Sequence, residues 1–172
     1  APHLDRYEIQ VFAGDGRLER IIERSYDPWK RSKADKDYFM EMVRAIYAGV
    51  PFEIQVKPTG FEPAIVYMHR GLRIHDDGSL WILTTHGIRD PANGAMATFD
   101  VFDTQGAYAK QVNVHGPWNG LKDGVFFLDD DHAFVVTGFA DAMITQFTGG
   151  NMTVEVEGDA GSMEVIYCRV KR

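Results

Sequence analysis

Two segments of this chain have nearly the same pattern, which limits the folds that it can adopt. Residues 71–87 read GLRIHDDGSLWILTTHG, and residues 123–139 read DGVFFLDDDHAFVVTGF. In each, an alternating apolar run meets an acidic tight turn and continues as a denser apolar run, the pattern of a β-hairpin with one buried strand. A second pair, VFAGDG at residues 11–16 and VFDTQG at residues 101–106, shares Val-Phe followed by a glycine turn. The chain therefore repeats two kinds of hairpin.

Joined in order, the two hairpins make a four-stranded antiparallel unit of about 40–50 residues, the length of a propeller blade. A single such sheet cannot bury both of its faces, so it must stack on copies of itself. The predicted fold class is all-β: a partial β-propeller of four-stranded antiparallel blades, in a single domain over residues 1–172. The outer hairpin of a first blade is assigned to residues 7–26, where Tyr7, Ile9 and Val11 alternate with polar residues before the turn at Asp15-Gly16. A second blade is assigned to 61–114 and a last blade to 121–172. Their predicted strands include LWILTTH (Leu80–His86), AMITQF and TVEVEGD. A β-sandwich with one helix is the alternative architecture.

One helix is predicted within the insertion at residues 27–51. Ser32 is a suitable N-cap, with Asp35 three residues later as an acidic variant of the capping box. Gly49 suits the C-terminal end, and Pro51 blocks continuation. The sequence predicts a helix over residues 33–48, with one apolar stripe made by Phe39, Met42, Val43 and Ile46.

Four segments resemble one known family. IHDDGSLWI at residues 74–82 and FDVFDTQG at 99–106 look like the turn and hairpin motifs of the NHL-like six-bladed β-propeller proteins of bacteria. The N-terminal DRYEIQVFAGDGRLERIIERSYDP and the C-terminal EVIYCRVKR are similar to the same group. The resemblance implies a propeller architecture and implies little about chemistry.

The chain is too short for the complete ring that the resemblance implies. Six blades need about 240 residues, whereas this chain has 172. An open set of blades would expose apolar faces and unpaired strands. We therefore expect self-association, or pairing with missing N-terminal blades, in place of a monomer. The Ala1-Pro2 start favours a trimmed end, and hence a secreted or periplasmic location if Ala1 is a processed terminus.

Charge and composition exclude several partners. The net charge is −7, and no Lys/Arg cluster provides the basic face that nucleic acid requires. No stretch approaches the roughly 20 apolar residues of a membrane span. Cys168 is the only cysteine, which excludes a disulfide framework and any CxxC site.

No catalytic motif stands out, so candidate site residues come from the predicted loops and strand ends. Histidines near a propeller channel could hold Ca²⁺ or Zn²⁺, although no cofactor is predicted. The acidic triplet Asp129–Asp131 lacks the spaced ligands of a calcium loop and is interpreted as a solvated turn. The connections 87–94 and 115–120 are rich in Gly, Pro and Asn, where binding residues gather. The candidate ligand-binding residues are His69, Arg70, His86, Arg89, Asp90, His115, Trp118 and Asn119.

Two functions follow from these candidates. The favoured hypothesis is a binding or scaffold module that holds a protein or small-molecule ligand. The alternative is a metal-dependent hydrolase or lyase, similar to propeller lactonases, that uses His69, His86 or His115. Metal analysis and chelator treatment distinguish the two.

Overall fold

A computed structural model of the chain describes residues 4–51, 55–66, 71–149 and 163–170. The chain forms two compact units. The first unit comprises Ala1–Trp29 and Phe61–Pro117, and the second comprises Lys30–Gly60 and Trp118–Arg172. The chain therefore passes from the first unit to the second after Trp29, returns at Phe61, and passes to the second again after Pro117.

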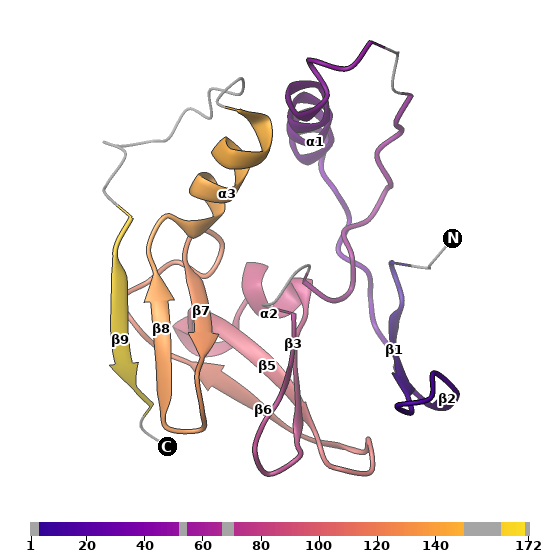
Figure 1. The fold of residues 1–172 in the computed structure, drawn as a ribbon, viewed down its shortest axis with the longest axis vertical. Coiled ribbons are helices and arrows are strands. Elements are labelled where there is room, and N and C mark those ends of the chain that lie inside the picture. The colour runs from indigo at the N-terminus through magenta and orange to yellow at the C-terminus, as the bar shows by residue number, and fades with distance from the viewer. Residues whose placement is uncertain (1–3, 52–54, 67–70, 150–162, 171–172) are drawn as a thin grey trace. The chain divides into compact units, whose positions relative to one another are not determined.

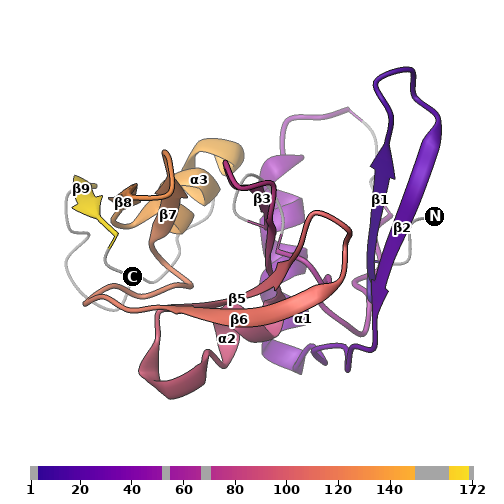
Figure 2. The ribbon, with the colours of Figure 1, turned by 90° about the horizontal axis from the view of Figure 1, so that it is seen from below.

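The first unit contains two antiparallel sheets, a two-stranded ribbon and a four-stranded sheet (Figures 1 and 2). The order β3-β4-β5-β6 is a meander, so each strand pairs with its neighbours in sequence. The antiparallel strands predicted within residues 61–114 are thus confirmed, as is the first hairpin. The strands are β1 (Tyr7–Phe12) and β2 (Leu18–Arg24) in the ribbon, and β3 (Leu72–Ile74), β4 (Leu80–Leu83), β5 (Ala97–Phe102) and β6 (Tyr108–Val114) in the sheet.

The core of the first unit lies between the ribbon and the four-stranded sheet. Tyr7 and Ile9 of β1 turn inward, as the period of two in the β1 sequence predicts, and Ile22 of β2 is buried opposite Ile9. β5 is buried along its whole length between β4 and β6, including the charged Asp100. The buried cluster consists of Tyr7, Ile9, Ile22, Ala64, Ile82 and Phe102.

A short helix, α2 (Thr85–Arg89), follows β4 directly. The strand predicted to run to His86 ends at Leu83, because the Thr84 side chain accepts a hydrogen bond from the Gly87 N–H and starts a helix. A 3₁₀ turn, η2 (Ala92–Gly94), then leads into β5.

The second unit combines two longer helices with a three-stranded antiparallel sheet in the order β7-β8-β9 (Figure 1). Helix α1 contacts α3, and β9 pairs directly with β8. The predicted helix is confirmed and ends two residues earlier than expected. The elements are α1 (Lys33–Ile46), β7 (Gly124–Phe127), β8 (His132–Val136), α3 (Phe139–Thr148) and β9 (Val165–Arg169). None of the described helices is long and apolar enough to cross a membrane.

The start of α1 has the capping box that the sequence predicts. The Ser32 Oγ accepts from the Asp35 N–H at 3.1 Å, and the Ser32 N–H donates to the Asp35 carboxylate at 2.8 Å. We expect Ser32→Ala to lower the free energy of unfolding of the second unit by about 1 kcal/mol. Ser32→Thr keeps the accepting oxygen and the hydroxyl proton that Ser32 donates to the Asp35 carboxylate at 2.7 Å, so it is the control and should retain most of that stability. Urea denaturation followed by circular dichroism measures both, and equal losses in the two variants would contradict the capping role.

The predicted all-β partial propeller is wrong. Over the residues that the structure describes, the fold is mixed α/β, with three α-helices and with sheets of two, four and three strands in place of repeated four-stranded blades. The main departure is at AMITQF, where a strand was predicted and α3 is found. Phe139, Met143 and Phe147 recur every four residues, which places them on one helix face. The predicted strand at TVEVEGD lies outside the described residues.

Candidate binding site at the end of the first hairpin

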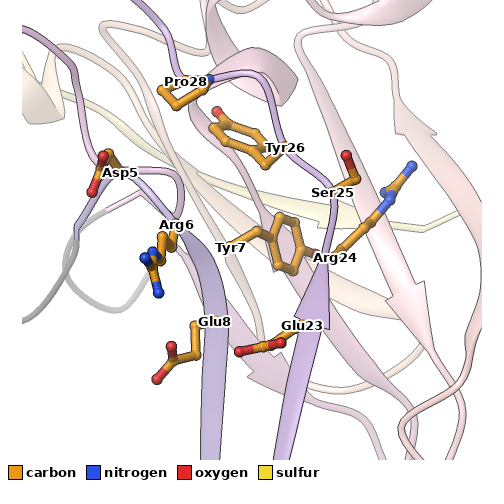
Figure 3. Close-up of a pocket in the computed structure, with 9 residues that line it drawn as sticks. All are labelled: Asp5, Arg6, Tyr7, Glu8, Glu23, Arg24, Ser25, Tyr26 and Pro28. Carbon is orange, nitrogen blue, oxygen red and sulfur yellow. The ribbon is translucent and has the colours of Figure 1, made fainter.

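A depression with a volume of about 430 Å³ lies in the first unit, where β1 begins and β2 ends (Figure 3). Two antiparallel strands bring their opposite chain ends together here, so residues distant in sequence share one wall. The depression is lined by Asp5, Arg6, Tyr7, Glu8, Glu23, Arg24, Ser25, Tyr26 and Pro28. It is mostly charged, with three carboxylates and two guanidinium groups.

One of the two guanidinium groups, that of Arg24, forms an ion pair with a buried carboxylate of the core, Asp100. Arg24 Nη1 lies 2.6 Å from Asp100 Oδ2, and the Asp100 side chain is only 6% exposed. The other Asp100 oxygen accepts from Gln111 Nε2 at 3.0 Å, and Arg24 also lies 4.3 Å from the centre of the Tyr108 ring. A buried carboxylate requires such a partner, because an uncompensated charge in the interior is costly. Arg24 therefore contributes little net positive charge to the depression.

Tyr7 faces Arg24 across the ladder and closes the inner side. Its side chain is buried, and its hydroxyl has no hydrogen-bond partner of good geometry within the described residues. Burial, followed by the negative charge of Asp100, raises the pKa of Tyr7 well above its ordinary value of 10.0. Burial likewise raises the pKa of Tyr26. Both phenols are protonated at neutral pH, so neither acts there as a general base.

The raised pKa of Tyr7 predicts a loss of stability in alkali. The unfolded chain ionises this phenol near pH 10 while the folded chain keeps it neutral, so stability is complete below about pH 10 and falls above it. We expect Tyr7→Phe to change the free energy of unfolding at pH 7 by less than about 1 kcal/mol, since within the described residues the hydroxyl has no hydrogen-bond partner of good geometry to lose. Above about pH 10 the variant should lose stability less steeply than the original chain. Urea titrations across this pH range measure the difference, and parallel curves would contradict the assignment.

Two glutamates form the outer wall of the depression. Glu8 and Glu23 are directly opposite each other in the β1–β2 ladder, on the face away from the core. Glu8 accepts from the neighbouring Gln10 amide at 2.8 Å. Figure 3 shows both carboxylates, with Asp5 and Arg6 on the β1 side. Like charges placed directly opposite in a sheet are destabilising, so this wall favours a cation.

Two further rings, those of His86 and Trp29, form an aromatic cluster with Tyr26. The His86 ring meets Tyr26 and Trp29 edge-on, with centroids 5.3 and 5.1 Å away, and His86 Nε2 is 2.8 Å from the Asp27 carbonyl oxygen. Arg89, one helical turn after His86, lies over Trp29 and forms an ion pair with Glu62. His86 and Arg89 thus hold the segment after β2 against α2, which supports the depression without lining it.

The sequence-predicted site residues do not form one site. His86 and Arg89 come together on α2, whereas Asp90 and His115 are exposed, Asp90 at the end of α2 and His115 just after β6. Trp118 and Asn119 belong to the second unit, where the Asn119 side chain accepts from the Leu121 N–H in a turn. The predicted residues His69 and Arg70 lie outside the described residues.

The residues of the depression were missed by sequence reasoning. Their signal was available in part: the Asp15-Gly16 turn sets the hairpin register, and counting back from it places Glu8 opposite Glu23. The contact of Arg24 with Asp100 had no such signal, because it joins different sheets. Among the described residues, no group of three His, Cys, Asp or Glu side chains converges as a metal site would require.

Comparisons of the chain with protein-family models, with curated proteins and with solved structures find no match. The resemblance to NHL-like proteins stays a prediction.

Proposed function

We propose that this chain is a binding module that holds a cationic group, an ammonium or a guanidinium, at the end of the β1–β2 hairpin. The observation that carries the proposal is the opposition of Glu8 and Glu23 on the wall of a depression large enough for a side-chain-sized group. Of the two guanidinium groups present, Arg24 is committed to Asp100, which leaves Arg6 against three carboxylates. The local charge is therefore negative.

The chemistry of the lining residues supports binding over catalysis. The carboxylates of Asp5, Glu8 and Glu23 serve as acceptors for N–H donors. Tyr26 is protonated at neutral pH and partly exposed, so its ring face is available to attract a cation. The residues that line the depression include no histidine and no cysteine, so an imidazole general base and a thiol nucleophile are not among them.

Titration with L-arginine methyl ester, followed by NMR chemical shifts, tests the proposal. We expect weak, saturable binding that weakens with added salt, because partly exposed charges are screened. Glu23→Gln should lower the affinity roughly fivefold, the equivalent of about 1 kcal/mol for one exposed charge contact.

A matched control variant is available on the same strand. Glu19 is exposed and lies 4.0 Å from Arg17, outside the depression. Glu19→Gln removes the same net charge and should leave the affinity unchanged within about twofold. Equal effects of Glu19→Gln and Glu23→Gln would show that only the overall charge matters and would overturn the assigned site.

A further inference from the structure

We infer that the ligand of this site is an extended peptide that adds to the free edge of β1, with a basic residue beside Glu8 and an apolar residue beside Phe12. This inference rests on the proposed function, since the basic residue is the cation held at the depression. It adds the class of ligand and the way in which the ligand's backbone is bound.

The first observation is the unpaired edge of β1. The ribbon has only two strands, and within the described residues no backbone group of Tyr7–Phe12 bonds to a strand other than β2. β1 contains no proline and no lysine, the residues that commonly protect an edge, and its register with β2 is regular from Tyr7 to Val11. Such an edge presents a row of unpaired N–H and C=O groups to an extended chain.

β2 is the less suitable edge of the same ribbon. Between the pairs Val11–Arg20 and Phe12–Leu18, β2 contains one residue more than β1, which is a β-bulge on β2. Such bulges disrupt the pairing of a further strand. Arg20 of β2 donates to the Thr104 carbonyl oxygen at 3.2 Å, which ties the strand to the turn between β5 and β6. The edge of β1 is therefore the one that matches a flat, regular partner strand.

The second observation is the pattern of side chains on the outer face of the ribbon. Along this face the cross-strand rows change from Glu8 opposite Glu23, to Gln10 opposite Ile21, to Phe12 opposite Leu18. The three apolar members are exposed, Phe12 to 54%, Ile21 to 47% and Leu18 to 44%. The face is thus acidic at one end and apolar at the other.

These rows dictate the chemistry of a matching strand. Side chains on one face of an extended chain repeat every two residues, or about 6.6–6.8 Å. A strand beside β1 therefore needs a cation opposite Glu8, a polar residue opposite Gln10 and an apolar residue opposite Phe12. Its other face would meet Ile9 and Val11, so the intervening residues are apolar. Read antiparallel to β1, the complementary sequence is Phe-Val-Thr-Val-Lys.

Fluorescence anisotropy of a labelled Phe-Val-Thr-Val-Lys peptide, acetylated and amidated at its ends, tests the inference on the whole chain. We expect it to bind at least tenfold more tightly than L-arginine methyl ester, because main-chain hydrogen bonds add to the charge contact. Two further peptides carry methyl groups on alternate backbone nitrogens. In an added strand only every second backbone N–H group points toward β1. The peptide methylated at those nitrogens should lose roughly tenfold in affinity, and the peptide methylated at the other nitrogens should bind like the parent peptide.

A charge exchange gives a second and independent readout. Glu8→Lys should abolish binding of the lysine peptide and restore binding to Phe-Val-Thr-Val-Glu, since cross-strand pairs of opposite charge attract. Circular dichroism verifies that the variant is folded. If both methylated peptides bind like the parent peptide, the edge is not used and the inference is wrong.

The remaining outcomes separate this inference from the proposed function. Binding of the arginine ester without tighter binding of the peptide would overturn the inference and leave the proposed function intact. Binding of neither probe would overturn both. A stable dimer in sedimentation that the peptide does not dissociate would show that a second copy occupies the edge, which also overturns the inference.

Discussion

Replacing Arg24 by methionine is expected to lower the free energy of unfolding of the first unit by about 3–5 kcal/mol. The variant leaves the Asp100 carboxylate, whose residue is only 5% exposed, in contact with the Gln111 amide but without the Arg24 guanidinium that balances its charge. Methionine keeps most of the aliphatic length of arginine, so the loss reports the missing charge more than missing packing. Urea denaturation followed by circular dichroism and tryptophan fluorescence measures the effect.

Two further variants isolate the buried charge as the cause. Arg17→Met removes an exposed arginine of the same hairpin, whose contacts to Asp15 and Glu19 are 3.9 and 4.0 Å. Such surface pairs contribute little, so we expect a change within about 1 kcal/mol. The double variant Arg24→Met with Asp100→Asn removes the uncompensated charge and should recover a large part of the stability. An Arg24→Met variant no less stable than Arg17→Met would contradict the account of the pair as a requirement of the core.

Local sequence signals predicted several elements correctly. The Asp15-Gly16 turn and the alternation of β1 identified the first hairpin, where Gly16 has a φ of +83° that favours glycine. The capping box of Ser32 and Asp35 identified the start of α1. These signals are reliable because the physical cause, a turn conformation or an orphan N–H group, lies within a few residues of the signal.

The errors in the predicted fold arose where two periodicities compete. The segment containing Met143 and Ile144 alternates well enough for a strand, yet Phe139, Met143 and Phe147 also fit a helix face. Gly138, with a φ of +62°, precedes the helix and separates it from β8. The predicted hairpins are present, but the prediction that they combine into repeated four-stranded blades is wrong. Among the described residues, the first hairpin forms a two-stranded ribbon and the last strands form a three-stranded sheet.

The candidate site was predictable only in part. His86 and Arg89 were singled out for their position after a buried strand, and the structure gives them a supporting role beside Trp29. The lining of the depression comes from the first hairpin, which carried no functional motif. The net negative charge of the depression depends on the ion pair of Arg24 with Asp100, and that ion pair follows from the packing of one sheet on another.

Gly87→Ala is expected to lower the free energy of unfolding of the first unit by about 2–3 kcal/mol, because the close contact of α2 with β5 leaves no room for a methyl group. A Cβ atom at Gly87 would lie 2.1 Å from the Thr98 carbonyl oxygen, far inside van der Waals contact. Thr98 cannot easily move away, since it pairs with Asn113 in the sheet and its Oγ1 donates to the Asn113 amide oxygen at 2.9 Å. Helix α2 must therefore shift or unfold.

Gly14, also in the first unit, provides the control variant, and the tryptophan fluorescence of that unit provides a second measurement. Gly14 has nothing within 4 Å of its Cβ position, so Gly14→Ala should change stability by no more than about 0.5 kcal/mol. A shift of α2 would also move His86 away from Trp29, which changes the tryptophan fluorescence of the folded state. It would further disturb Tyr26 at the depression, so Gly87→Ala should weaken binding of L-arginine methyl ester although residue 87 lies outside the lining. If Gly87→Ala matched Gly14→Ala in both stability and ligand affinity, α2 would not be the support that positions the site.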